Sequence, residues 1–446
     1  MSSLIHSKII RLAARLASAD ITWVLHRLRL AFGLRGLIPR PVPLVSRCVE
    51  GGGTQKRNEE TSTRLLVFSH NLDREGASIS LKELVCGLKD RQGILSEVIA
   101  FSDGPLRFDY ERHGIPVEVL PSMLNRISTI KRLDKEIKLL ASRINASSAD
   151  VVFVNTLLNF PAVLAAEEAG VPSVWNPRES EPWDSYFRFL PDPVAQQAIA
   201  AIGLPRCVVF VADSTRSVWK DFEQAANFKV IHNALNLDRF VESTPKDKAS
   251  VRRSLEWSAD EVVFLCVGTL CERKGQQDAI LALETIANRL VANIRLVFVG
   301  ENSERYGQAL RHAALRLHEN DRIRICFETP TERIGNYYFA ADAFLLCSRV
   351  ESYPRVILEA LAFGLPIIST PVFGVAEQLP NDADAFFYSP GDVTQLGEQI
   401  LEMANSPMLR QRLNERAKAR FAELPSFDQM LKSYAEIIQN VRRCGP

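Results

Sequence analysis

The sequence predicts an α/β protein with two doubly wound domains, and three observations support this fold class. The chain has 446 residues, which is more than one hydrophobic core usually organises. Short apolar runs alternate with helical stretches of roughly 10–15 residues, the pattern of βαβ units in a doubly wound sheet. Hydrophobic residues make up 46% and charged residues 24% of the chain, a balance typical of soluble globular proteins.

Apolar runs place the strands of the first half. We expect buried strands at 64–69, 96–101, 117–120, 150–155, 171–175 and within 207–215. The last of these runs is expected to be the final strand of this half. Its closing residues Asp213, Ser214 and Thr215 are expected to cap the helix that carries Trp219.

The second half is organised around the stretch from Asp342 to Glu377. Ala343–Cys347 is a short apolar run that indicates a buried parallel strand. Pro354 fits the first position of the following helix, because its missing N–H costs nothing there. Gly364 ends that helix before a second buried run at 366–369.

Two glutamates stand out in this stretch. Glu351 lies in the loop at the carboxyl end of the predicted strand, and Glu359 lies about two turns into the helix. Between them, the first-turn amides of Arg355 and Val356 have no intrahelical acceptor. Such a helix N-terminus binds anions, so we expect a phosphate group at this position.

These residues resemble the donor site of the family-4 retaining glycosyltransferases, which have the GT-B fold. The resemblance rests on Glu351 and Glu359 with seven residues between them, on the Tyr353–Pro354 pair, and on the sequence EALAFGLPIIST that begins at Glu359. It implies that Glu351 contacts the transferred sugar and that Glu359 binds the ribose of the nucleotide. The alternative is an ordinary βα unit with one loop glutamate and one solvated helix glutamate.

A second element resembles the part of that family that binds the nucleotide diphosphate. Gly268–Thr269 follows a buried strand and precedes Lys274, which matches the family lysine. The family arginine is missing, because Thr269 occupies its position, and Arg273 is the candidate replacement. The resemblance also places the nucleotide base against the backbone at Phe327–Thr329. The alternative for Arg273 and Lys274 is that both are ordinary surface charges.

Two loops of the first half provide the acceptor-side candidates. Gly76 and Ala77 stand where the family has a glycine-rich loop, and Gly76 allows close approach of a ligand to the backbone. Asn176 falls where related enzymes often have a histidine, and it retains the ability to hydrogen-bond a sugar hydroxyl. Arg178 and Glu179 match a pattern found in part of the family. A plain βα turn and a solvated charged loop are the alternatives.

The ends of the chain complete the predicted organisation. Residues 1–58 hold ten Lys/Arg and two acidic residues in an amphipathic pattern, which fits either a membrane-surface segment or a helical pair that packs on the body or mediates self-association. The expected units are an extension and linker, an acceptor-side domain, a nucleotide-sugar domain, and a helix that returns to the first domain; their bounds are 1–60, 61–240, 241–424 and 425–446.

The resemblance implies a retaining enzyme that moves a sugar from a nucleotide-diphosphate sugar to a glycan or glycolipid acceptor in surface polysaccharide biosynthesis. It implies no metal and no cofactor. A sugar-nucleotide binder without catalysis and a nucleotide-sugar epimerase remain as alternatives. A net charge of +1 gives no reason to expect nucleic acid. Scattered cysteines and the lack of an apolar run of 18 residues favour a cytoplasmic protein, with contact at the inner membrane face if the basic segment binds lipid.

Overall fold

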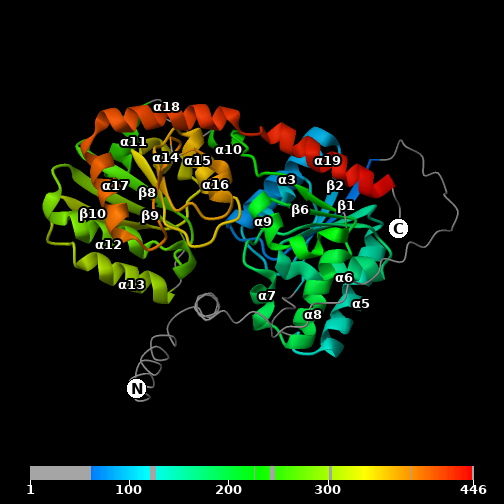
Figure 1. The fold of residues 1–446 in the computed structure, drawn as a ribbon. Helices are drawn as coiled ribbons and strands as arrows, with labels where there is room; N and C mark the ends of the chain where they lie inside the picture. Colours follow the sequence, from blue (N-terminus) through cyan, green and yellow to red (C-terminus); the bar gives the residue numbers. More distant parts are fainter. Residues whose placement is uncertain are drawn as a thin grey trace, which may run out of the picture.

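The computed structural model describes residues 62–120, 127–225, 227–241, 247–300, 304–381 and 383–443. These residues form two α/β domains that lie side by side (Figure 1). The basic segment 1–58 lies outside the described residues, so both interpretations of it remain predictions. Among the helices that the structure describes, none is long and apolar enough to cross a membrane.

The first domain contains a parallel sheet that has seven strands in the described part of the chain. Its strand order is β3-β2-β1-β4-β5-β6-β7, with β4 at the centre. Because every pair of neighbouring strands is parallel, the carboxyl ends lie along one edge, where a doubly wound sheet binds its ligand. The strands are β1 (Arg64–Ser69), β2 (Leu95–Ala100), β3 (Val117–Val119), β4 (Val151–Asn155), β5 (Ser173–Asn176), β6 (Cys207–Phe210) and β7 (Phe228–Val230).

Helices cover both faces of this sheet, and each face has its own hydrophobic core. One core lies under α5, α6 and α8, and the other lies under α3, α4 and the last helix described, α19 (Phe427–Arg443). The helices are α3 (Gly76–Gln92), α4 (Leu106–Arg112), α5 (Ile130–Ser147), α6 (Phe160–Glu168), α7 (Trp183–Tyr186), α8 (Asp192–Ala200) and α9 (Asp213–Val218). The short helix α10 (Asp238–Val241) belongs to the connection between the domains, and its Phe240 packs on Phe363 of the second domain.

The second domain repeats this arrangement with a parallel sheet of six strands within the described residues. Its order is β10-β9-β8-β11-β12-β13, so β8 and β11 are neighbours at its centre. The loops that follow β8 and β11 therefore meet at one edge of the sheet. The strands are β8 (Glu261–Val267), β9 (Asn293–Val299), β10 (Ile323–Glu328), β11 (Ala343–Leu346), β12 (Ile367–Ser369) and β13 (Phe386–Phe387).

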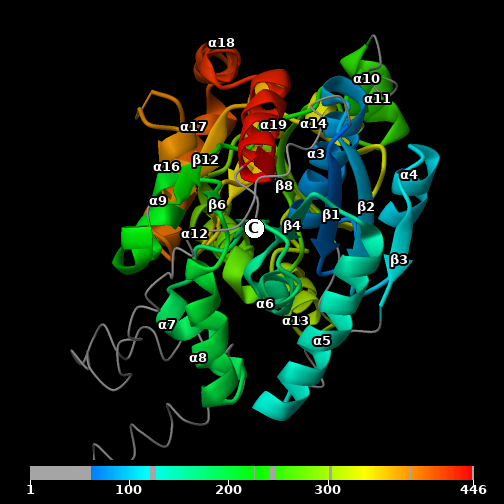
Figure 2. The same cartoon turned by 90° about the vertical axis from the view of Figure 1, so that its right-hand side faces the viewer.

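The helices of the second half differ in which domain they cover. α18 packs on α15 of the second domain, whereas α19 packs on α3, β4 and β5 of the first (Figure 2). The helices are α11 (Lys248–Ser254), α12 (Gln277–Ile286), α13 (Glu304–Leu315), α14 (Ile334–Ala340), α15 (Arg355–Ala362), α16 (Gly374–Gln378), α17 (Val393–Asn405), α18 (Pro407–Glu423) and α19 (Phe427–Arg443).

The predicted fold class is confirmed, but three local predictions are wrong. The last strand of the first sheet is β7 rather than the run at 207–215, because a three-residue edge strand pairs beyond it. Pro354 is the N-cap of α15 rather than its first helical residue, and Ile357 N donates to its carbonyl. Asp213 is the first residue of α9 and does not cap it.

Two glycines next to the site give a matched test of its packing. A Cβ atom on Gly374 would lie 1.6 Å from the carbonyl oxygen of Ser352, whereas one on Gly76 would meet nothing within 4 Å. Gly374→Ala is therefore expected to lower the free energy of unfolding by about 1–3 kcal/mol or more, because backbone must move. Gly76→Ala is the control and should leave the melting temperature unchanged or slightly higher. The same loss of stability in both variants would contradict this packing.

Candidate active site

The two predicted charged residues Lys274 and Glu351 meet where the loops after β8 and β11 converge. Lys274 Nζ lies 2.5 Å from Glu351 Oε1, and Ser348 Oγ donates to the same oxygen at 2.6 Å. The turn at Gly268 has a φ of 141°, and the Lys274 side chain runs over it. Lys274 thus reaches from η6 (Glu272–Lys274) to the loop after β11, with a side chain that is 16% exposed.

Glu351 is charged in this setting. Burial raises the pKa of its carboxyl. Lys274, Arg273 and the hydroxyl of Ser348 lower the pKa by more than burial raises it, so the net pKa lies below the usual value. Lys274 and Glu351 therefore form an ion pair, and only 6% of Glu351 is exposed. A buried pair of this kind can exchange partners when an anion enters, because the ammonium group attracts phosphate as it attracts carboxylate.

Arg273 lies beside this pair and faces both domains. Its Nη1 donates to the carbonyl oxygen of Val350 at 2.9 Å, which fixes the guanidinium next to the Glu351 loop. Burial lowers the pKa of Arg273, but the carboxylates of Glu351 and of Glu181 in the first domain raise it above its ordinary value. Arg273 is therefore a cation in the same loop after β8 as Thr269, which is exposed and uncharged.

Glu359 lies on the buried side of α15 with three polar partners. The Tyr338 hydroxyl donates to Oε2 at 2.8 Å, and Arg239 Nη1 donates to Oε1 at 3.2 Å. Arg355 Nε lies 3.7 Å from Oε1. Only 4% of Glu359 is exposed. To bind a ribose diol, its carboxylate would have to give up the hydrogen bond from Arg239, a residue of the interdomain connection.

The Arg355 side chain does not point toward a ligand. Its guanidinium makes two hydrogen bonds to Glu83 of α3, at 2.9 and 3.0 Å, and both residues are buried. This bidentate ion pair joins the donor helix α15 to the first domain. The predicted anion site therefore consists of the first-turn amides of Arg355 and Val356 and does not include the Arg355 side chain.

The other donor-side residues are placed as follows. Tyr353 is buried, and its ring stacks on His232 of the interdomain connection with 4.7 Å between the ring centroids. The Phe327 ring packs between Phe298 and Arg311, so both faces of the ring already have partners. Thr329 follows β10 and is exposed.

The acceptor-side residues fall into two groups. Gly76 begins α3 and is exposed with open space around it, and Ala77 follows it. Arg178 is held by Asn155 and Asn233, with 2.7 Å from Nη1 to the Asn233 side-chain oxygen. Glu179 accepts hydrogen bonds from the backbone amides of Leu157 and Arg178. Burial raises the pKa of Glu179 despite these bonds.

Asn176 is a correction to the sequence analysis. Its side chain is fully buried, with Nδ2 at 2.5 Å from the carbonyl oxygen of Val209 and Oδ1 at 3.4 Å from the Tyr434 hydroxyl. The expectation that it hydrogen-bonds a sugar hydroxyl is therefore contradicted. The side chain points into the space between the sheet and α19, where the amide satisfies buried polar atoms.

Several residues of the site were missed at the sequence level. Ser348 carried a usable signal, because it lies three residues before Glu351 at the end of a predicted strand. Tyr338, Arg239 and Glu83 carried none, since each meets Glu359 or Arg355 only through the tertiary fold.

Comparison with known proteins agrees with this geometry. Residues 74–239 match the model of Glycosyltransferase Family 4, and residues 247–420 match that of Glycosyl transferases group 1. Together the two models cover most of the chain. The chain belongs to the family-4 glycosyltransferases. The predicted family is thus confirmed, and each of its two models matches one of the two domains.

Individual relatives of this family-4 chain are distant. A GDP-mannose-dependent monoacylated alpha-(1-6)-phosphatidylinositol monomannoside mannosyltransferase of Corynebacterium glutamicum is 27% identical over 261 residues, which is 56% of this chain and 67% of that protein. N-acetyl-alpha-D-glucosaminyl L-malate synthase of Bacillus anthracis is 25% identical over 44% of this chain and 50% of its own length. The alignments therefore span only half to two thirds of these relatives.

Solved structures support the fold more fully. Anabaena HepE, determined in complex with UDP and glucose, has a TM-score of 0.70 at 20% identity, and the match covers 85% of this chain and all of that one. At this identity the likeness shows the fold alone. It confirms the two facing Rossmann-like domains of a GT-B protein.

Proposed function

We propose that this protein is a retaining glycosyltransferase that moves a sugar from a nucleotide-diphosphate sugar to a glycan or glycolipid acceptor in surface polysaccharide biosynthesis. The observation that carries this proposal is the Lys274–Glu351 pair beside the N-terminus of α15. A cation, a carboxylate and free helix amides converge there from two loops of one sheet. These are the groups that a sugar diphosphate needs.

The proposed reaction breaks the bond between the anomeric carbon and the diphosphate. Negative charge develops on the leaving diphosphate, and positive charge develops on the sugar. Lys274, Arg273 and the first-turn amides of α15 would stabilise the diphosphate, which is a preorganised electrostatic role. The acceptor oxygen then bonds to the same face of the sugar, and its proton passes to the departing phosphate oxygen. Glu351 would hold sugar hydroxyls, and Glu359 would hold the ribose.

The proposal gives no role to a metal or a cofactor. Two cationic side chains, Lys274 and Arg273, lie beside the α15 N-terminus and supply the positive charge that a departing diphosphate requires. The carboxylate closest to them, Glu351, is already neutralised by Lys274.

The base and the acceptor are left open by the relatives. The Corynebacterium protein is named for GDP-mannose and a phosphatidylinositol mannoside, whereas HepE was solved with UDP and glucose. A glycolipid acceptor is consistent with the first name. The screen that tests the proposal must therefore include several nucleotides.

The test is a thermal-shift screen with UDP, GDP, ADP and their sugars, combined with an assay of released nucleoside diphosphate. A ligand at a hundred times its Kd should stabilise the folded protein by about 2.7 kcal/mol. We expect one base to raise the melting temperature and one sugar donor to release diphosphate. No shift with any nucleotide would contradict the donor site.

A binder without catalysis is the second candidate function. Two observations favour it, since Thr269 leaves the family cation missing and Asn176 is buried away from any ligand. This candidate predicts a melting-temperature shift with nucleotide but no release of diphosphate from any sugar donor. The same screen therefore separates the two functions.

A further inference from the structure

Helix α9 of the first domain is capped from the second domain. Its own N-cap residue is Ala212, which has no side-chain acceptor. The carboxylate of Glu377 on α16 accepts hydrogen bonds from the backbone amides of Asp213 at 2.9 Å and Ser214 at 2.7 Å. Burial raises the pKa of Glu377, but hydrogen bonds from His232, Ser214 and Asp213 outweigh it and lower the pKa to about 2. A charged carboxylate therefore joins the two domains.

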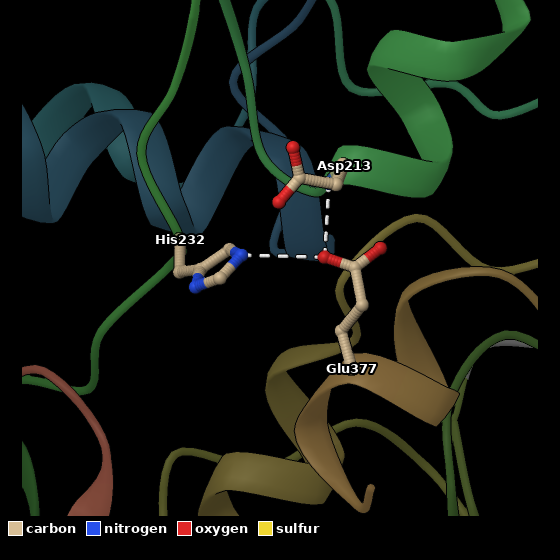
Figure 3. A group of neighbouring side chains, drawn as sticks. All are labelled: Asp213, His232 and Glu377. Carbon is tan, nitrogen blue, oxygen red and sulfur yellow. Dashed lines mark hydrogen bonds and ion pairs between the residues drawn. The ribbon is translucent and has the colours of Figure 1, made fainter.

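The same carboxylate reaches the loop between Glu351 and α15 through His232. His232 Nε2 lies 3.3 Å from Glu377 Oε2, and the two side chains point toward each other (Figure 3). The imidazole stacks on the Tyr353 ring with an angle of 10° between the planes. Asn233, the next residue, donates its Nδ2 to the carbonyl oxygen of Tyr353 at 3.0 Å. The interdomain connection thus holds the residue that precedes Pro354 and α15.

Helix α16 also contacts this loop directly. Gln378, which follows Glu377, is buried and donates Nε2 to the carbonyl oxygen of Pro354 at 3.0 Å. Gly374 at the start of α16 leaves no space above the carbonyl of Ser352. One short helix therefore binds the first domain through Glu377 and the N-cap of α15 through Gln378.

A metal ion is the other interpretation of this cluster. The ligand atoms of Asp213, His232 and Glu377 lie within 4.8 Å of one another. Both Glu377 oxygens, however, already accept hydrogen bonds from backbone amides at the N-terminus of α9. The partial positive charge of a helix N-terminus disfavours a cation. The contacts favour a cap.

We infer that Glu377 is a positioning residue that couples docking of the first domain to the geometry of the phosphate-binding end of α15. It acts through His232 on Tyr353 and through its neighbour Gln378 on Pro354. If the domains separate, the two hydrogen bonds from the backbone amides of Asp213 and Ser214 to Glu377 break, and His232 loses its carboxylate partner. This inference rests on the proposed function, because the loop matters for catalysis only if it binds a sugar nucleotide.

The test compares Glu377→Gln with Asp213→Asn, which changes an exposed carboxylate of the same cluster. The nucleoside diphosphate identified among UDP, GDP and ADP serves as the binding probe. Glu377→Gln should keep its Kd within about threefold but lower turnover about tenfold, because the docked state is less populated. Small-angle X-ray scattering of the full chain should show a larger radius of gyration. Asp213→Asn should change neither the turnover nor the radius of gyration.

A second variant tests the path through His232. If Glu377 and His232 act on the same loop, the double variant Glu377→Gln/His232→Ala should lose little more turnover than Glu377→Gln alone. If the turnover loss of the double variant equals the product of the losses in Glu377→Gln and in His232→Ala alone, the two residues act independently, and the path through His232 is overturned. Wild-type turnover and an unchanged radius of gyration in Glu377→Gln would overturn the inference, as would an equal loss in Asp213→Asn, which a metal site predicts. If the wild-type protein binds no nucleotide, the proposed function fails, while the scattering comparison still decides whether Glu377 holds the two domains together.

Discussion

Replacing Lys274 by alanine is expected to lower turnover of the sugar donor by about 10²–10³-fold, the range seen when one preorganised group that stabilises developing negative charge is removed. In the structure Lys274 Nζ pairs with Glu351 beside the first-turn amides of α15. It is the cation best placed to meet a departing diphosphate. The measurement is release of nucleoside diphosphate at saturating donor, with the melting temperature recorded for each variant.

Two controls separate chemistry from folding. Lys432→Ala removes an exposed lysine of α19 and should retain full turnover. Lys274→Ala also leaves the buried Glu351 carboxylate without its cation, which destabilises by itself. The double variant Lys274→Met/Glu351→Gln removes that charge and should recover stability without recovering turnover. Near-normal turnover in Lys274→Ala would show that the diphosphate binds elsewhere.

Breaking the Arg355–Glu83 pair is expected to give the largest loss of stability among the ion pairs described. Both side chains are buried, 7% and 4% exposed, and two hydrogen bonds join them across the domain boundary. Arg355→Ala leaves a buried carboxylate, which costs about 3–5 kcal/mol in such pairs. Arg239 lies 3.5 Å from Glu83 and should keep the loss near the lower limit. Thermal and urea unfolding measure it.

The matched control is another Arg–Glu pair in the same chain. Arg289 and Glu398 are paired, but their side chains are 53% and 52% exposed, so Arg289→Ala should cost far less stability than Arg355→Ala. The double variant Arg355→Met/Glu83→Gln should be more stable than Arg355→Ala, because no buried charge remains unpaired. Equal losses in Arg355→Ala and Arg289→Ala would contradict the interdomain contact.

Much of the fold follows from local pattern. The apolar run at 64–69 predicts β1 with its observed bounds, because charged or polar residues flank five buried positions. Gly364 ends α15 as expected, with a φ of 69° that suits glycine. β7 was missed because three residues, one of them the exposed Lys229, carry too little hydrophobic signal. Its pairing with β6 is a property of the assembled sheet.

The site was predictable where chemistry lies in the backbone or in one motif. The loop after β11 places Glu351 at the carboxyl edge of the sheet, and the loop after the neighbouring strand β8 places Lys274 beside it. Side-chain directions were not predictable. Arg355 meets Glu83 across 272 residues of sequence, and Asn176 turns inward because of its position in β5. Cross-domain partners such as Glu377 for α9 leave no trace in local spacing.

The most direct test of the central claim is a crystal structure of the full chain with the nucleoside diphosphate that stabilises it. The account predicts that the diphosphate contacts Lys274 Nζ and the amides of Arg355 and Val356, that Glu359 contacts the ribose, and that the base lies against the backbone near Phe327. A nucleotide bound away from the loops after β8 and β11, with the Lys274–Glu351 pair undisturbed, would contradict it.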